Sequence, residues 1–186
     1  MINAYDFDET IYDGDSSVNF YKYCLKRNKK VFLAAPVQIF GALLYVLKIT
    51  DKTKFKERVF SFLKQIDNID DYIEDFWKEN LDKIKPWYLA QHDKSDVIIS
   101  ASPEFLLKPL EKKLDIKVIA SIVDKKTGKF ISKNCHDYEK IKRYEEQYSK
   151  KIKAFYSDSI KADKPMFQYA EKAYLVTKDK VEKIEV

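Results

Sequence analysis

Apolar runs of strand length frame a long middle stretch in which apolar residues follow a helical spacing. The first run, residues 2–5, ends directly in an acidic sequence at 6–9. Further runs of strand length come after the middle stretch, at 96–100, 117–123, 152–156, 173–177 and 181–184. Buried parallel strands are continuous apolar runs, and here they alternate with helical patterns. This order predicts an α/β fold with three layers and a mostly parallel sheet.

The middle stretch, 17–92, predicts only helices. Its apolar residues recur three or four positions apart, as on one face of a helix. They include Phe20, Tyr23, Cys24, Phe55, Val59, Phe60, Phe62, Leu63, Tyr72, Ile73, Phe76, Trp77 and Leu81. We expect about four helical elements that form a small core of their own. The α/β core would then consist of 1–16 and 93–186, interrupted by an all-helical insert at 17–92.

Two further helices are expected outside the insert. Pro103 suits the first turn of a helix, and leucines at helical spacing would form its buried face. These are Leu106, Leu107, Leu110 and Leu114. Residues 138–148 form a charged amphipathic pattern that predicts the second helix. Between the two, 125–129 has the composition of a turn.

Composition and charge narrow the classes of protein. Hydrophobic residues make up 45% of the 186 positions and only three are Gly, which favours a packed globular chain over a disordered or repetitive one. The net charge of +5 favours anionic ligands, such as phosphorylated metabolites or phospholipid head groups. No nucleic-acid motif accompanies the basic residues, so we expect no nucleic-acid partner. Acidic residues this close to Met1 are incompatible with a signal peptide, and Cys24 and Cys135 alone suit a reduced compartment, so we expect a cytoplasmic protein.

Asp6 and Asp8 are the strongest candidates for chemistry. Two residues apart on a strand, they point to the same side, at the strand end where ligands bind in open α/β sheets. One carboxylate can attack a phosphate ester while the other protonates the leaving alcohol and then activates water. Two clustered anions need a hard cation and a positive side chain nearby before a phosphate can approach.

Four segments, in order along the chain, resemble the four motifs of the haloacid dehalogenase superfamily, within its phosphoserine-phosphatase-like branch (subfamily IB). They are Asp6-Phe7-Asp8-Glu9-Thr10, Val97-Ile98-Ile99-Ser100, a downstream lysine, and Ser157-Asp158-Ser159 followed by Asp163. The resemblance covers about residues 5–166. It implies a Rossmann-like core, a mobile helical cap inserted between the first and second motifs, and Mg²⁺ as cofactor.

By position, the resemblance implies catalytic roles for Asp6, Asp8, Ser100 and Lys140. Asp6 would be the nucleophile, Asp8 the general acid and base, and Ser100 a hydrogen-bond donor to a phosphoryl oxygen. The helix that starts near Pro103 would direct its positive dipole end toward the same anion. Residues 134–140 resemble the stretch that leads into the third motif, which assigns the lysine to Lys140. Lys133 is the alternative to Lys140, and Ser102 is the alternative to Ser100.

The resemblance also implies substrate and metal ligands. The substrate-binding residues would be Thr10, Asp15, Ser100, Ala101 and Lys140. The metal ligands would be Asp6, Asp8 through its backbone carbonyl, Asp158 and Asp163, the last directly or through water. A helix-capping role suits Asp15 equally well.

Two positions depart from the family pattern. Glu9 stands where Gly is common, and Ser157 stands where Gly or Asp is usual. Neither change removes a catalytic group. Glu9 adds negative charge beside the site, which bears on metal affinity and substrate choice.

The segment 31–47 is nearly all apolar and is bordered by basic residues on both sides. About 17 helical residues span about 25 Å, less than the roughly 30 Å of a bilayer core, so a transmembrane span is disfavoured. Pro36 and Gly41 within it suggest a broken helix or a helical hairpin. Burial inside the insert and peripheral docking on a membrane surface remain as alternatives.

The sequence thus predicts a Mg²⁺-dependent phosphomonoester hydrolase that acts through an aspartyl-phosphate on Asp6. Its substrate would be a small phosphometabolite of the phosphoserine kind or a phospholipid head-group phosphate. The rival hypothesis is a catalytically weak module on the same fold that binds phosphate or a membrane surface.

Overall fold

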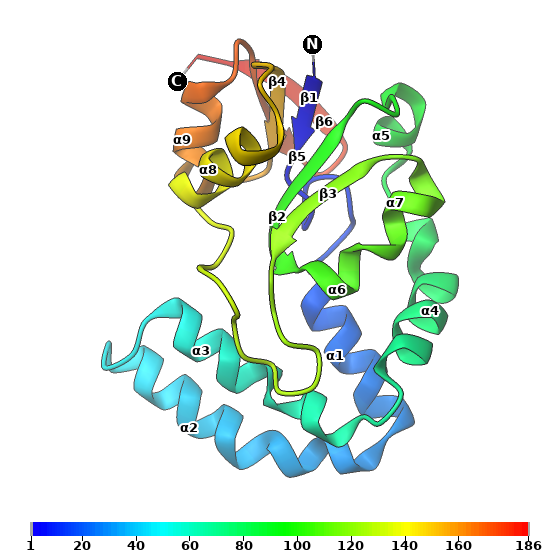
Figure 1. The fold of residues 1–186 in the computed structure, drawn as a ribbon, viewed down its shortest axis with the longest axis vertical. Helices are drawn as coiled ribbons and strands as arrows, with labels where there is room; N and C mark the ends of the chain where they lie inside the picture. Colours follow the sequence, from blue (N-terminus) through cyan, green and yellow to red (C-terminus); the bar gives the residue numbers. More distant parts are fainter. Residues whose placement is uncertain (1, 186) are drawn as a thin grey trace.

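A six-stranded sheet forms the centre of the computed structural model, which describes residues 2–185 (Figure 1). The strands lie in the order β3-β2-β1-β4-β5-β6, all parallel except β6, which pairs with β5 antiparallel. Their bounds are Ile2–Tyr5 (β1), Val97–Pro103 (β2), Lys117–Ser121 (β3), Ile152–Ser157 (β4), Ala173–Thr177 (β5) and Lys180–Ile184 (β6). The predicted α/β fold with a mostly parallel sheet is confirmed.

Alternating side chains of the strands supply two hydrophobic clusters, one on each face of the sheet. In β2, Ile98 enters one cluster, whereas Val97 and Ile99 enter the other, as the two-residue period of a strand requires. Helices α8 and α9 cover the second cluster, and α6 and α7 lie over the first with the inserted helices (Figure 1). Their bounds are Glu104–Leu107 (α6), Pro109–Leu114 (α7), Tyr138–Gln147 (α8) and Ile160–Tyr169 (α9).

The single helix expected from Pro103 is wrong. Pro103 still belongs to β2, and the leucine-rich segment forms two short helices that separate at Pro109. Proline has no N–H to continue the hydrogen bonding of a preceding helix, but it suits the first turn of a new one. Because α6 has only four residues, the dipole expected from this helix at the anion site is correspondingly small.

Every regular element of the insert is helical, as predicted. The described structure has five α-helices and three 3₁₀ segments there, more than the four elements expected. Their bounds are Ser16–Arg27 (α1), Lys29–Ala34 (η1), Ala35–Val46 (α2), Lys52–Val59 (α3), Phe60–Gln65 (η2), Ile69–Asn80 (α4), Leu81–Lys83 (η3) and Pro86–Gln91 (α5).

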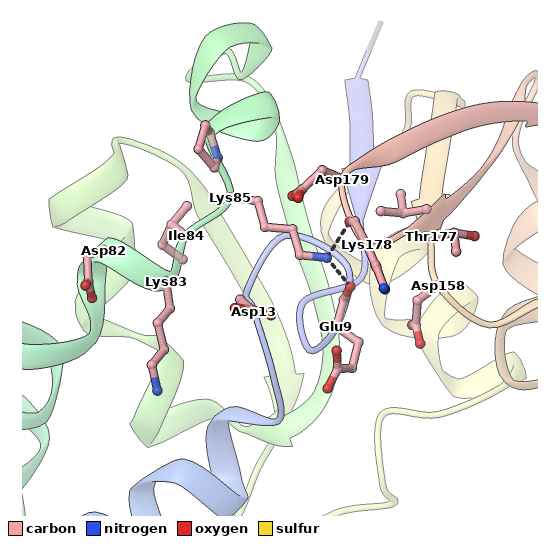
Figure 2. Close-up of a pocket in the computed structure, with 12 residues that line it drawn as sticks. Glu9, Asp13, Asp82, Lys83, Ile84, Lys85, Asp158, Thr177, Lys178 and Asp179 are labelled. Carbon is pink, nitrogen blue, oxygen red and sulfur yellow. Dashed lines mark hydrogen bonds between the residues drawn. The ribbon is translucent and has the colours of Figure 1, made fainter.

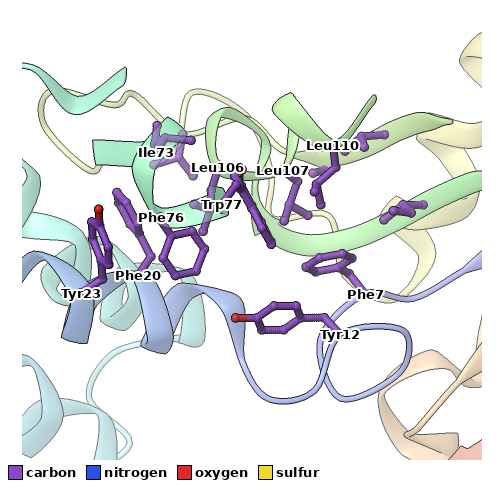
Figure 3. Packing of buried hydrophobic residues seen from close by; sticks show 14 of the residues in the cluster. Phe7, Tyr12, Phe20, Tyr23, Ile73, Phe76, Trp77, Leu106, Leu107 and Leu110 are labelled. Carbon is purple, nitrogen blue, oxygen red and sulfur yellow. Dashed lines mark hydrogen bonds between the residues drawn. The ribbon is translucent and has the colours of Figure 1, made fainter. Parts of the chain in front are cut away.

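The insert does not have a core of its own, contrary to the expectation. Aromatic side chains of α1 and α4 join residues of the sheet and of α6 in one continuous cluster (Figure 3). Trp77 of α4 packs edge-on against Phe7, with ring centroids 6.1 Å apart, and its indole N–H donates to the carbonyl of Leu106 at 2.6 Å. The large aromatic face of α4 therefore finds its partners on the sheet side of the molecule, and α1 and α4 are fixed to the α/β core.

The apolar segment at 31–47 is mostly exposed, so its burial inside the insert is excluded. Segment η1 runs directly into α2, with Pro36 in the first turn of the helix. Helix α2 continues through Gly41 without interruption. The glycine allows α3 to pack closely, since a Cβ at this position would lie 2.6 Å from Cδ of Arg58 in α3. Helices α2 and α3 thus form a closely packed hairpin with one face of α2 in solvent.

Candidate active site

The predicted catalytic residues meet at the point where the strand order reverses. Strand β1 pairs with β2 on one side and with β4 on the other, and ligands of open α/β sheets bind beside the carboxyl ends of such strands. Asp6 follows β1 and Asp158 follows β4. A cavity of about 460 Å³ at this edge is lined by the predicted residues Asp6, Asp8, Asp15, Ser100, Ala101, Lys140, Asp158 and Asp163.

Lys140 lies at the centre of a buried charge cluster. Its Nζ is 2.7 Å from Oδ1 of Asp6 and 2.6 Å from Oδ1 of Asp163, and the lysine side chain is only 2% exposed. Burial lowers the pKa of Lys140, but the carboxylates of Asp6 and Asp163 outweigh it and raise this pKa above its ordinary value. The other oxygen of Asp163 accepts a hydrogen bond from Ser157 at 2.7 Å. Ser157, one of the two departures from the motif pattern, thus orients Asp163.

Asp8 has the surroundings of a group that exchanges protons. Its carboxyl accepts hydrogen bonds from the backbone N–H of Ser16, at 2.6 Å, and from the hydroxyl of Ser102. Burial and the nearby charge of Asp15 raise the pKa of Asp8 to about 6, although both serines act in the opposite direction. A carboxyl with this pKa can hold a proton near neutral pH and release it, which is what a general acid and base requires.

Ser100 and Ser102 have different positions in the site. The hydroxyl of Ser102 is bound to Asp8 and lies 3.1 Å from the hydroxyl of Ser17. The hydroxyl oxygen of Ser100 accepts the N–H of Ser102 at 3.0 Å, which leaves its own hydrogen free to donate into the cavity. This arrangement favours Ser100 over Ser102 as the donor to a bound anion.

Thr10 connects the first acidic loop to Asp158. Its hydroxyl donates to Oδ1 of Asp158 at 3.2 Å and accepts the N–H of the same residue at 2.9 Å. Thr10 is fully buried and does not line the cavity, so its contacts are with the loop after β4. It positions Asp158 relative to the loop that carries Asp6 and Asp8.

Lys85 supports the same loop from the other side, and the sequence did not single it out. Its Nζ donates to the carbonyl of Glu9 at 2.6 Å and to that of Lys178 at 2.7 Å (Figure 2). Glu9 has a φ of +58°, in the left-handed region that glycine adopts at low cost, so the Gly expected here from the resemblance would suit this conformation. The hydrogen bond from Lys85 holds this conformation. Lys85, Glu9 and Asp158 also line a separate cavity of about 810 Å³.

The structure does not bring Lys133, the alternative to Lys140, into the cavity. Lys133 is exposed, and its carbonyl accepts a hydrogen bond from the guanidinium of Arg143. Asp15 caps α1, because its carboxylate accepts the N–H of Val18 at 2.9 Å, and it also lines the cavity, where substrate binding stays a prediction.

Lys56 of α3 is a site residue that sequence reasoning missed. Its Nζ donates to the carbonyl of Ala101 at 2.9 Å, and the side chain lines the cavity. Burial, and then the charge of Lys52, lower the pKa of Lys56 to about 8, while the carboxylates of Asp8, Asp15 and Asp6 act in the opposite direction. Its only sequence signal is one lysine among several on a basic helix, which no pattern distinguishes. Lys56 brings a positive charge from the insert to the catalytic carboxylates.

We expect Lys56→Met to raise the KM for an anionic substrate by about 10- to 100-fold, since a hydrogen bond to a charged group contributes about 1.5–3 kcal/mol. The ammonium is charged below about pH 8 and neutral above it, so substrate affinity of the natural chain should fall as pH rises through this value. KM measured against pH checks both statements. Lys54→Met, an exposed lysine on the same helix, is the control and should change little. Equal KM values for the natural chain and Lys56→Met would exclude this role.

The geometry defines an α/β protein with buried carboxylates and a lysine at the reversal point of its sheet. A model of the haloacid dehalogenase-like hydrolase family matches residues 4–168. The chain therefore belongs to the haloacid dehalogenase-like hydrolase family, as its motifs indicated. No curated protein matches the sequence.

Three solved structures share the fold at low sequence identity. A protein of unknown function from Bordetella pertussis Tohama I has a TM-score of 0.71 and 15% identity, with 92% of this chain and 88% of that chain covered. A phosphoserine phosphohydrolase-like protein from Francisella tularensis has a TM-score of 0.55 and 15% identity, with 93% and 86% covered. A hydrolase of the same family from Salmonella enterica serovar Typhi has a TM-score of 0.59 and 14% identity, with 91% and 60% covered.

Members of the superfamily generally use Mg²⁺, and the cavity has suitable donor chemistry. Six acidic side chains and three lysines line it, so an anion would meet excess negative charge, and carboxylate oxygens are ligands that Mg²⁺ prefers. Within residues 2–185, however, no three acidic, His or Cys side chains converge on one point. Both oxygens of Asp163 are already engaged by Lys140 and Ser157. Asp6, Asp8 and Asp158 all line the cavity, and a ligand set of two carboxylates with the backbone carbonyl of Asp8 would need only two acidic side chains.

Proposed function

We propose that this hydrolase cleaves phosphate monoesters through a covalent phosphate on Asp6, with Mg²⁺ as cofactor. The observation that supports the proposal most directly is the buried cluster of Asp6, Lys140 and Asp163 next to the proton-exchanging carboxyl of Asp8. Family membership supplies the reaction class, hydrolysis, and the phosphoserine phosphohydrolase-like neighbour is consistent with a phosphate ester as substrate.

In the proposed reaction, Oδ of Asp6 attacks phosphorus while the bond from phosphorus to the leaving oxygen breaks. Asp8 gives its proton to that oxygen, which leaves as an alcohol. The carboxylate of Asp8 then takes a proton from water, whose oxygen attacks phosphorus and restores Asp6 with release of inorganic phosphate. Lys140 and Ser100 would hold the phosphoryl oxygens during both steps.

The cofactor would be held by Asp6, Asp158 and the backbone carbonyl of Asp8. When bound, Mg²⁺ would offset the negative charge of the carboxylates and phosphoryl oxygens. Asp163 would act indirectly, by fixing Lys140. We thus propose a role for Asp163 other than the metal binding, direct or through water, that the resemblance implies.

Two substrate classes match different parts of the cavity. Asp15 and Lys56 present one negative and one positive charge beside the catalytic carboxylates, which would suit the ammonium and carboxylate of a phosphoserine-like molecule. Apolar side chains from α1, α3 and η2 form the outer wall, which would suit a larger apolar leaving group such as a lipid. They are Val18, Tyr21, Phe55, Val59 and Phe60.

Phosphate release from para-nitrophenyl phosphate, with Mg²⁺ and again with excess EDTA, tests the proposal. We expect turnover with Mg²⁺ and its loss with EDTA, restored when Mg²⁺ is added back. A panel of phosphometabolites and phospholipid phosphates would then separate the two substrate classes. Failure of every compound to exceed the Asp6→Asn variant would contradict enzymatic function and favour the rival binding module.

A further inference from the structure

The strongest feature outside the active site is an apolar surface on η1 and α2. Among the residues described, sixteen large hydrophobic side chains are exposed, and ten of them lie between residues 32 and 49. These are Phe32, Leu33, Val37, Ile39, Phe40, Leu43, Tyr45, Val46, Leu47 and Ile49. We call them the α2 surface. Soluble monomers rarely expose a contiguous apolar patch of this kind unless it binds something.

The α2 surface is one side of a helix whose other side is fixed to the protein. Gln38 donates to the carbonyl of Val59 and accepts the hydroxyl of Tyr21, both at 2.8 Å. Tyr45, the least exposed member of the α2 surface at 40%, also stacks its ring on Phe55 of α3, with centroids 4.8 Å apart. Ile39, on the opposite side of α2, is 70% exposed. In Figure 1 this helix lies at the end of the molecule opposite to the two termini.

The segment that carries the α2 surface contains only positive charges, although Asp51 follows it directly and Glu57 of α3 lines a small pocket with Val37. Residues 16–50 contain six of the 35 Lys and Arg residues and none of the 30 Asp and Glu residues, so the remainder of the chain has a net charge of −1. The whole positive excess of the protein therefore lies in the segment that carries the apolar surface. Lys29, Lys30 and Lys48 are exposed at its two ends and form no ion pair within residues 2–185.

We propose that the α2 surface docks on an anionic lipid membrane, with α2 lying in the plane of the interface. An apolar face bordered by lysines matches a bilayer surface, where acyl chains lie beneath negative head groups. A second copy of this chain matches less well, because apposed α2 surfaces would bring lysines of like charge together. The proposal concerns where the protein is located and does not depend on the phosphatase activity.

A transmembrane helix does not fit the length and packing of this segment. The stretch Lys29–Val46 is long and apolar enough by length and composition for a membrane span, with 17% of it buried. The 12 residues of α2 nevertheless reach only about 18 Å, less than a bilayer core of about 30 Å, and the remaining six belong to the 3₁₀ segment η1. Its packed side contacts α3, which carries Lys52, Lys54, Glu57 and Arg58. Only the exposed side of α2 can enter lipid without burying these charges.

Co-sedimentation of the full chain with vesicles tests the docking. Vesicles of phosphatidylcholine with phosphatidylglycerol should bind the chain at low salt, pure phosphatidylcholine should bind it more weakly, and salt of about 0.5 M should weaken the electrostatic part. Ile39→Asp should lower the bound fraction at least about tenfold, because it removes one buried apolar side chain and adds a negative charge. Leu89→Asp is the control, since Leu89 is 44% exposed on α5, which lies at the end of the molecule opposite to α2 (Figure 1). The Asp6→Asn variant should bind as the natural chain does, which separates docking from catalysis.

Four outcomes would overturn the proposal. The first is no binding of the natural chain to anionic vesicles at low salt. The second is an equal loss of binding for Ile39→Asp and Leu89→Asp. The third is a dimer in analytical ultracentrifugation that Ile39→Asp dissociates, without vesicle binding, because the α2 surface would then be a protein interface. Bound protein that resists alkaline carbonate would likewise replace peripheral docking by a membrane span.

Discussion

Replacing Asp6 by Asn is expected to lower turnover by about 10⁴-fold or more, the scale seen when a hydrolase loses its nucleophile. The amide oxygen of Asn cannot carry the phosphoryl group, so the covalent step is lost. The fold should survive, because burial and the nearby Asp163 disfavour charge on Asp6 and raise its pKa to about 7, despite the opposing effect of Lys140. A neutral side chain of the same shape is therefore tolerated at this position. Single-turnover kinetics and circular dichroism of the purified variant measure the two effects.

Asp8→Asn is the informative comparison for this experiment. It keeps the nucleophile but removes the group that exchanges protons, so we expect a smaller loss of about 10²- to 10⁴-fold. It should be least damaging for para-nitrophenyl phosphate, whose leaving group needs little protonation. If Asp6→Asn retained activity comparable to that of Asp8→Asn, Asp6 would not be the nucleophile.

Lys140→Met is expected to lower the free energy of unfolding by about 3–5 kcal/mol, besides removing phosphate binding. Lys140 is the cation between two buried carboxylates, and deletion of one member of a buried ion pair leaves uncompensated charge. Urea unfolding at neutral pH measures the loss. Lys142→Met, on the exposed side of the same helix, should change stability by no more than about 0.5 kcal/mol.

A second substitution checks the cause of that loss. Asp163→Asn in the Lys140→Met background removes one of the two carboxyl groups that have lost their cation, so part of the lost stability should return. Additive losses from the two substitutions would show instead that Lys140 stabilises the protein by packing.

Most of the fold followed from the sequence because strands and helices have different apolar periods. The strands at 2–5, 152–156 and 173–177 were predicted closely, since buried parallel strands are continuous apolar runs. The break at Pro109 was missed because four leucines on one side outweighed a single proline. The shared core was missed because helical periodicity shows that a face is buried but not which partner covers it.

The residues of the candidate site were likewise predicted only in part. Asp6, Asp8, Ser100, Asp158 and Asp163 were found because they stand at strand ends or in ordered motifs, and the structure places all five around one cavity. Lys56 and Lys85 were missed because each reaches the site from the insert, through contacts that only the folded chain creates. The cytoplasmic localisation remains a prediction.

The common core of insert and sheet limits how this hydrolase can change. Helix α4 cannot be exchanged for that of a relative without also replacing the residues around Phe7 and Leu106 that pack against Trp77. The α2–α3 hairpin carries both Lys56 and the exposed side of α2, and among its described residues only Val59 packs against that cluster. Substitutions in this one hairpin can therefore change both the proposed substrate contact of Lys56 and the proposed membrane contact of α2. The α/β core would not have to change.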